Sequence, residues 1–360
     1  MSFHELEGLV RELGEAPYRA RQLFTCIYAQ REQDVSKFST LSKDFRSALV
    51  SKGLSVGMPT IARRFISSDG TVRYLIALED GQTVETVWMP DGDNGEAGDG
   101  SQAGDEEEAG TASKSYRRAT ICVSSQVGCA VNCGFCLTAL LGLQRNLTAG
   151  EIVGQVVVVL NDHSVAVDRE RINLVFMGQG EPLLNYDNFI KAVQLLHEGV
   201  GIPQSRMTVS TSGIVPKIHD LGREETRPKL AISLNAPDDE IREGIMPLNR
   251  KWNIAAILEA ARAFPLRARE KLTFEYVLLK DINDQAEHAE KVAALVGSLR
   301  CKINLIAWNP GPEVPYEMPS TESVAAFQAV LIRRGVPAFI RRPRGRDIYA
   351  ACGQLKRSIA

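Results

Sequence analysis

Apolar and polar positions divide the chain into a helical start, a short strand-like region and a long alternation of strands and helices. Within residues 1–55, three stretches carry apolar side chains at the spacing of an α-helix: residues 4–13, 19–29 and 41–50. Residues 56–90 alternate like strands instead, and Asp69 and Asp80, each followed by glycine, are typical of hairpin turns. The pattern predicts a small helical region followed by a short β-hairpin extension.

From residue 118 onward, nearly continuous apolar runs alternate with helical stretches. The predicted strands are residues 119–124, 172–177, 207–211, 229–234, 273–279 and 302–307. The predicted helices are residues 149–161, 186–198, 253–263, 286–299 and 322–335. Buried strands separated by helices are typical of a parallel sheet covered on its outer face. Residues 118–355 are therefore predicted to form an α/β fold, a partial (β/α)6 barrel, with its site at the carboxyl ends of the strands.

Residues 91–117 interrupt this pattern. The first twenty of them carry eight acids and neither Lys nor Arg, and no large apolar residue occurs before Tyr116. Such a segment cannot bury enough surface to offset its ordering entropy, so a disordered acidic insertion is expected. Without these eight acids the formal charge of −2 becomes +6. A mildly basic body suits an RNA ligand but does not identify one.

Composition narrows the class of protein. Apolar residues make up 44% of the chain, yet no apolar run approaches the roughly 20 residues that span a membrane. The start of the chain lacks a basic-then-apolar signal pattern, and the seven cysteines are not spaced like the disulfide framework of a secreted protein. We expect a cytoplasmic protein without a membrane partner.

Three of the cysteines fall within eight residues, directly after the first predicted barrel strand. Cys129, Cys133 and Cys136 have the spacing C-x-x-x-C-x-x-C, so one short loop can bring three thiolates to one metal centre. A structural zinc site is normally closed by a fourth protein ligand, and no His or Cys lies at a short spacing to supply it. A zinc knuckle or three buried thiols remain alternatives. A cubane iron–sulfur cluster on three cysteines would leave one iron open to a ligand.

Four segments add to this spacing, and they occur in the order Cys122-Val-Ser-Ser-Gln-Val-Gly-Cys129, Gly178-Gln-Gly-Glu-Pro-Leu-Leu-Asn185, Ser210-Thr-Ser-Gly213 and Ala350-Ala-Cys-Gly-Gln-Leu355. The cysteine spacing resembles the cluster-binding signature of the radical S-adenosylmethionine (SAM) superfamily. Together with the four segments it resembles the RlmN/Cfr family, RNA methyltransferases that act on adenine carbons. The resemblance extends from about residue 16 to residue 355. It implies a [4Fe-4S] cluster on the three cysteines and two SAM molecules per turnover.

The same resemblance implies a set of SAM contacts: Gly180, Glu181, Ser210, Ser233, Leu234, Asn235 and Asn309. Glycine lets backbone approach a ligand closely, and the Glu181 carboxylate can hold the α-ammonium group of SAM. Two positions depart from the family pattern. Gln179 replaces the usual Met, and Asn235 replaces the His of many relatives and cannot titrate near neutral pH. Without the resemblance, these would be ordinary turn or cap residues.

Three further residues receive catalytic roles from the resemblance. Cys352 would accept a methyl group from one SAM and carry it to the adenine ring. Cys122 would then attack the protein–RNA thioether and leave a transient Cys122–Cys352 disulfide. Glu85 matches the family's proton acceptor, with an exposed strand glutamate as its alternative. The alternative for Cys122 is a purely structural role as a small buried residue on a strand. Cys26 and Cys301 are assigned to the core.

The function implied is methylation of adenosine carbon-2 in 23S rRNA, with the adenosine next to the anticodon of tRNA as a further candidate. Two alternatives stay open: carbon-8 methylation of 23S rRNA, as in the Cfr subgroup, and a non-enzymatic iron–sulfur module that binds RNA. The expected partners are the RNA substrates and an electron donor such as flavodoxin, and the enzyme is expected to be a monomer. The helical region over residues 1–55 is expected to bind RNA.

Overall fold

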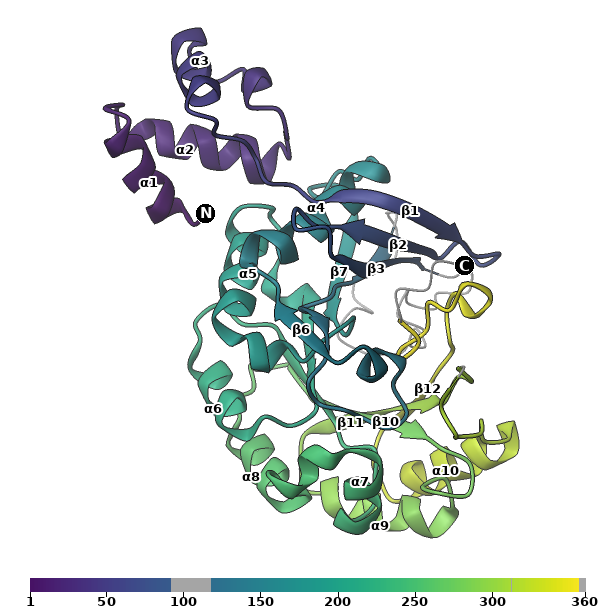
Figure 1. Cartoon of the computed structure of the whole chain (residues 1–360). Coiled ribbons are helices and arrows are strands. Elements are labelled where there is room, and N and C mark those ends of the chain that lie inside the picture. Colours follow the sequence, from purple (N-terminus) through teal and green to yellow (C-terminus); the bar gives the residue numbers. More distant parts are fainter. Residues whose placement is uncertain (92–117, 312, 356–360) are drawn as a thin grey trace.

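The computed structural model describes residues 1–91, 118–311 and 313–355, and its architecture is shown in Figure 1. Nearly all of the expected disordered insertion, residues 92–117, lies outside the described residues. None of the helices in the described part of the chain is long and apolar enough to cross a membrane.

The chain begins with three α-helices that form a lobe beside the barrel (Figure 1). They are α1 (Phe3–Glu12), α2 (Tyr18–Phe24), which continues as a π-helical turn over Thr25–Ala29, and α3 (Lys43–Ser51). Ser2 and Ser42 cap the first and third helices by accepting backbone hydrogen bonds. Polar contacts join the lobe to the barrel, since Arg31 donates from Nη2 to the Val165 carbonyl at 2.6 Å.

Ten strands form one sheet in the order β1-β2-β3-β4-β7-β8-β9-β10-β11-β12. Three antiparallel strands come first: β1 (Thr60–Ile66), β2 (Val72–Ala77) and β3 (Thr83–Pro90). Seven mutually parallel strands follow: β4 (Arg118–Cys122), β7 (Arg171–Phe176), β8 (Met207–Thr211), β9 (Lys229–Ser233), β10 (Leu272–Leu278), β11 (Cys301–Ala307) and β12 (Ala338–Arg341). All six predicted barrel strands are confirmed, whereas β12 was not predicted.

The strand extension is not a separate hairpin. Its last strand, β3, pairs antiparallel with β4, and Val87 lies opposite Cys122 in this pairing. The expected hairpins therefore exist, but they widen the barrel sheet by three strands. This continuity places the inner face of β3 next to the inner face of the barrel.

Helices cover the outer face of the parallel strands (Figure 1). They are α4 (Ala149–Asp162), α5 (Tyr186–Glu198), α6 (Val215–Arg223), α7 (Asp239–Ile245), α8 (Ile254–Ala263), α9 (Ala286–Val296) and α10 (Thr321–Arg333). The five predicted helices are confirmed, and α6 and α7 are additional. A small two-stranded sheet, β5 (Gln126–Gly128) with β6 (Leu143–Asn146), brackets the cysteine loop.

Candidate active site

Two adjoining cavities lie inside the barrel, towards the carboxyl ends of its strands. The cysteine-loop cavity has an empty volume of about 920 Å³ and is lined by Cys129, Cys133 and Cys136 together with Gly180, Glu181, Ser210, Ser233 and Asn235. The paired-cysteine cavity has an empty volume of about 620 Å³ and is lined by Cys122, Met177, Asn309 and Cys352, among others. Met177, Ile306 and Cys352 line both cavities, so the two spaces adjoin at these residues.

The three clustered cysteines are held by contacts from distant parts of the chain. The amide of Gly134 donates to the Ile245 carbonyl at 2.9 Å, and the Trp308 indole donates to the Phe135 carbonyl at 2.9 Å. Burial raises the pKa of the Cys133 and Cys136 thiols and raises the pKa of Cys129 to about 12. Such thiols keep their protons at neutral pH unless a cationic centre stabilises the thiolates.

This donor set fits a cluster. All three thiols are free and line one large cavity. No three His, Cys, Asp or Glu side chains in residues 1–91, 118–311 and 313–355 form a site for a single metal ion. A cubane takes each thiolate on a different iron, so it suits sulfurs that are spread around a cavity.

The turn after β7 brings a buried carboxylate to the cysteine-loop cavity. Glu181 is 4% exposed, and one carboxylate oxygen accepts hydrogen bonds from the backbone amide and the hydroxyl of Ser212, both at 2.7 Å. Burial raises the pKa of Glu181, although these hydrogen bonds oppose the shift. Gly180 precedes it with a φ of +100°, and a Cβ there would lie 2.6 Å from Cβ of Gln126. Any side chain at position 180 would therefore clash with Gln126, so this position requires glycine.

The other expected SAM contacts divide between the two cavities. The hydroxyls of Ser210 and Ser233 lie 3.5 Å apart on neighbouring strands in the cysteine-loop cavity. Asn235 has a left-handed φ of 59°, and its side-chain oxygen accepts from the Val277 amide at 2.9 Å. The Leu234 side chain is fully buried and lines neither cavity. Asn309 lines the paired-cysteine cavity instead.

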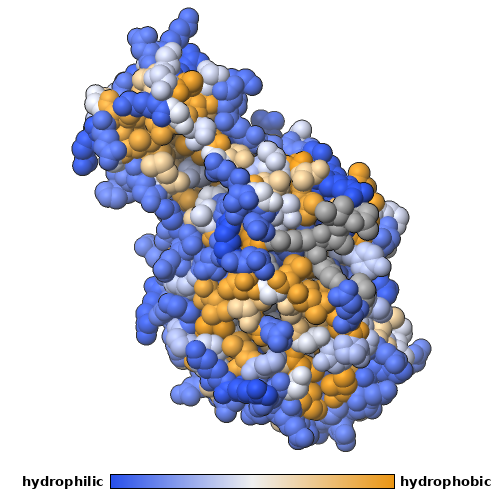
Figure 2. All heavy atoms as spheres, in the orientation of Figure 1, coloured by the Kyte–Doolittle hydropathy of each residue, from blue (hydrophilic) through white to orange (hydrophobic). Residues whose placement is uncertain are grey.

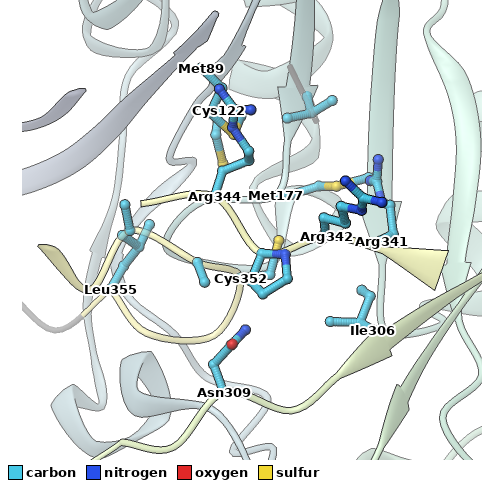
Figure 3. Close-up of a pocket in the computed structure, with 14 residues that line it drawn as sticks. Met89, Cys122, Met177, Ile306, Asn309, Arg341, Arg342, Arg344, Cys352 and Leu355 are labelled. Atoms are coloured by element: carbon cyan, nitrogen blue, oxygen red, sulfur yellow. The ribbon is translucent and has the colours of Figure 1, made fainter. Parts of the chain in front are cut away.

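Cys122 and Cys352 lie in one cavity although 229 positions separate them in the sequence (Figure 3). Cys122 ends β4 and is buried, whereas Cys352 is exposed on the C-terminal loop. Burial, with a further contribution from the Cys352 thiol, raises the pKa of Cys122. In the space-filling view, apolar side chains gather over the middle of this face of the barrel, and hydrophilic side chains surround them (Figure 2).

The loop that carries Cys352 is attached directly to the cysteine loop. The Leu137 amide donates to the Gly353 carbonyl at 2.8 Å, and the Thr138 hydroxyl donates to the Leu355 carbonyl at 2.8 Å. These two residues follow Cys136 without interruption. The position of Cys352 is therefore coupled to the loop that presents the three clustered thiols.

The extension holds the other end of this loop. The Asp347 carboxylate accepts from the Ser67 hydroxyl at 2.5 Å and from the Ser68 amide at 3.1 Å. The Gly345 amide donates to the Asp69 carboxylate at 3.0 Å. Hydrogen bonds from Ser67 and Ser68 hold the pKa of Asp347 below its ordinary value. The β1–β2 turn, whose role was not predicted, thus fixes the loop that carries Cys352.

Glu85 is not an exposed strand residue, so that alternative is wrong. Its side chain is fully buried on β3 and forms an ion pair with Arg73 on β2. Gln179 donates from Nε2 to the second carboxylate oxygen of Glu85 at 3.4 Å. Glu85 and Gln179 line neither cavity. Gln179, which replaces the usual Met of the family, therefore contacts Glu85 and does not face the cysteine-loop cavity.

Two charged residues at the site were not predicted. Arg242 on α7 is fully buried and donates to the carbonyls of Ser212 at 2.7 Å and Ser233 at 3.0 Å, next to the expected SAM contacts. Burial lowers the pKa of Arg242 to about 10. Glu275 on β10 lines the cysteine-loop cavity. Neither stands in a motif, and only the three-dimensional fold brings them to the site.

The comparisons with known proteins agree with this geometry. A family model described as the radical SAM superfamily matches residues 123–293, and one described as the ribosomal RNA large subunit methyltransferase N-terminal domain matches residues 1–53. The chain is 59% identical to a probable dual-specificity RNA methyltransferase RlmN of Koribacter versatilis, over 97% of this chain and 98% of the relative. It is 42% identical to the dual-specificity RNA methyltransferase RlmN of Campylobacter jejuni, over 98% and 96%.

A solved structure is similar over the same length. The crystal structure of a radical SAM methyltransferase from Sphaerobacter thermophilus superposes with a TM-score of 0.86 at 40% sequence identity. The match covers 99% of this chain and 98% of that one. Sequence and fold therefore point to the same group of proteins.

Proposed function

Because the chain belongs to the RlmN family of radical SAM RNA methyltransferases, we propose that it methylates carbon-2 of adenosine in 23S rRNA, with the adenosine next to the tRNA anticodon as a second substrate. It is a SAM-dependent RNA methyltransferase that uses a [4Fe-4S] cluster. The non-enzymatic alternative is set aside on this ground. The observation that carries the proposal is the pair of thiols, Cys122 and Cys352, in a cavity that adjoins the cysteine-loop cavity.

The chain's own residues divide the work between the two cavities. Cys129, Cys133 and Cys136 would hold the cluster, which in its reduced form would supply the electron for the reductive cleavage of SAM. Glu181, Ser210 and Ser233 bind and orient SAM beside it. Leu234, Asn235 and Asn309 complete the proposed contacts. Asn235 lines the cysteine-loop cavity and Asn309 lines the paired-cysteine cavity, whereas Leu234 packs in the core and acts by positioning its neighbours.

Cys352 carries the methyl group. Its exposure at the junction of the cavities suits a thiolate that first takes a methyl group from one SAM by displacement. With a second SAM bound, the radical chemistry of the cluster would remove a hydrogen atom from this methyl group, and the resulting carbon would bond to the adenine ring. Loss of the ring proton then leaves one excess electron on the adduct, which would return to the oxidised cluster. Glu85 is the proposed acceptor of the ring proton. Because it is held by Arg73 and Gln179 outside both cavities, this role requires the carboxylate to be freed when RNA is bound.

Cys122 releases the product. The Cys122 thiol gives up its proton as its sulfur attacks the Cys352 sulfur. The bond from the Cys352 sulfur to carbon breaks, and the electron pair stays with the carbon, which takes up a proton in exchange to complete the methyl group. The two sulfurs are left as a disulfide that must be reduced before the next turnover. We assign electron supply to a low-potential donor such as flavodoxin, and propose that the enzyme acts as a monomer in the cytoplasm.

The adenine must leave its stack to reach these thiols. Arg341, Arg342 and Arg344 line the paired-cysteine cavity, but Arg344 is tied to Asp69 and to the Pro90 carbonyl. The helices of residues 1–55 are proposed to hold the RNA outside the barrel, and the match of residues 1–53 to a ribosomal RNA methyltransferase domain supports this. Arg21 and Lys43 are exposed there and can contact phosphates.

A crosslinking experiment tests the two-cysteine proposal. Cys122→Ala should still methylate Cys352 and attack adenine, and should then stall as a covalent protein–RNA adduct that is visible on a denaturing gel. Cys352→Ala and the double variant should give no adduct, and Cys301→Ala, at a core cysteine, serves as the control. Normal turnover by Cys122→Ala would contradict the proposal. Mass spectrometry of the modified nucleosides then decides the ring position, since 8-methyladenosine would replace the carbon-2 assignment with carbon-8.

A further inference from the structure

Glu275 is a buried carboxylate that the steps above do not use. It lies in the middle of β10, is 5% exposed and lines the cysteine-loop cavity. One of its oxygens, Oε1, accepts from the Asn304 side chain at 3.0 Å and lies 3.8 Å from Nη2 of Arg341. The other oxygen, Oε2, is buried and has no hydrogen-bond partner among the described residues.

Such an oxygen is unfavourable in a folded protein. Buried polar atoms nearly always have a partner, and a buried acceptor that lacks one loses its water without compensation. An ionised carboxylate can only accept hydrogen bonds, so the missing partner must be a donor. Because Glu275 lines a cavity, a ligand can supply that donor.

The neighbours of Glu275 narrow the kind of donor. In the strand pairing, Glu275 lies opposite Ser233, whose hydroxyl is 3.5 Å from that of Ser210. A carboxylate and two hydroxyls therefore occur on three consecutive strands that line the cysteine-loop cavity. Glu181 is the other carboxylate that lines the cavity in the described part of the chain, and it already accepts several hydrogen bonds.

SAM offers donors at three places: its ammonium group, its ribose hydroxyls and its adenine amino group. Glu181 next to the cluster suits the ammonium group. Carboxylates commonly bind ribose hydroxyls in nucleotide sites, and serine hydroxyls can both donate and accept beside them. We propose that Glu275 binds the ribose hydroxyls of SAM through Oε2, with Ser210 and Ser233 beside it. This inference rests on SAM as the cofactor and is independent of which adenine carbon is methylated.

Binding of SAM analogues to the cluster-loaded, unreduced protein tests the assignment without catalysis. The wild-type chain should bind SAM about tenfold more tightly than at least one of 2′-deoxy-SAM and 3′-deoxy-SAM, because removing the hydroxyl leaves the charged acceptor unpaired again. Glu275→Gln should bind SAM about tenfold more weakly. It should also lose most of the discrimination between SAM and that analogue.

Glu270→Gln is the matched control. Glu270 is equally buried and pairs with Arg227 at 2.8 Å, but it lines neither cavity. Its replacement should lower the melting temperature and leave both SAM affinity and analogue discrimination unchanged. If Glu275→Gln does not fold, Glu275→Asp allows the same comparison. Equal binding of SAM and both analogues by the wild-type chain, or equal discrimination in the Glu275 variant, overturns the proposal.

Discussion

Single residues at this site owe their chemistry to burial, which a sequence shows only in part. The cysteine spacing predicts that Cys129, Cys133 and Cys136 lie together, and they line one cavity in the structure, because residues on one loop need no long-range fold to meet. Glu85 and Glu275 show the opposite case. Both lie on strands whose sequence gives no sign of a buried carboxylate, and both are buried in the folded sheet. Their partners, Arg73, Asn304 and Arg341, come from neighbouring strands that the sequence does not align.

Replacing a cluster ligand and replacing a core cysteine should have different effects on cluster content and on stability. Cys133→Ala should lower iron and sulfide retention by at least the roughly 10- to 100-fold that removing an outer-shell partner costs a metal site. SAM cleavage should disappear with the cluster. Cys301→Ala is the control, because Cys301 is 6% exposed and lies at the start of β11. It should cost about 1 kcal/mol of stability and keep the cluster. Full activity of Cys133→Ala with zinc alone would contradict the ligand assignment.

Elements were predictable where the apolar pattern was long and local. The six barrel strands and five of the covering helices follow from it, since each buries a continuous apolar face. β12 was missed because it has four residues, and α7 because it has seven. The pairing of β3 with β4 could not be read from the chain, since the acidic segment separates the two strands. The sequence motifs also gave no sign that the β1–β2 turn forms hydrogen bonds to the loop that carries Cys352.

That turn gives an element-scale prediction. Asp347→Asn should weaken the hydrogen bonds to Ser67 and Ser68, and amide exchange in residues 345–355 should become roughly five- to tenfold faster. Cluster content should not change, whereas methyl transfer to Cys352 should slow. Asp168→Asn is the control, because Asp168 is exposed and pairs only with its neighbour Arg169 at 3.6 Å in the described structure. Unchanged exchange in the loop would show that the turn does not fix it.

The same contact has a defined pH dependence. Because the folded-state pKa of Asp347 is lowered, mainly by the Ser67 hydrogen bond, its contribution is fully present above the ordinary value of 3.8. It is lost as the pH falls through the lowered pKa. Protection of the loop in the wild-type chain should therefore be constant around neutral pH and decrease only in strong acid, whereas Asp347→Asn should lack this acid-dependent step.

At the scale of the whole molecule, the sheet brings together segments that are far apart in the chain. The paired-cysteine cavity draws its lining from β3, β4, β7, β11, β12 and the C-terminal loop, so no single segment contains the site. The acidic segment is connected to this arrangement at one place. Pro90 pairs with Ala119, and the Asp91 amide donates to the Arg118 carbonyl at 3.1 Å. The two ends that flank residues 92–117 are therefore already neighbours, and a short turn can join them.

Replacing residues 92–115 with two glycines should consequently leave the melting temperature and methylation nearly unchanged. The replacement removes seven acids and one lysine, which moves the formal net charge from −2 to +4. RNA binding should become tighter at low salt, and the difference should vanish at high salt, because screening removes long-range repulsion between the acids and the RNA. A second variant, in which the seven acids become Asn or Gln at unchanged length, separates charge from bulk. If it binds RNA as tightly as the shortened chain, charge is the cause, whereas a large loss of melting temperature in the shortened chain alone would show that residues 92–115 contribute to packing.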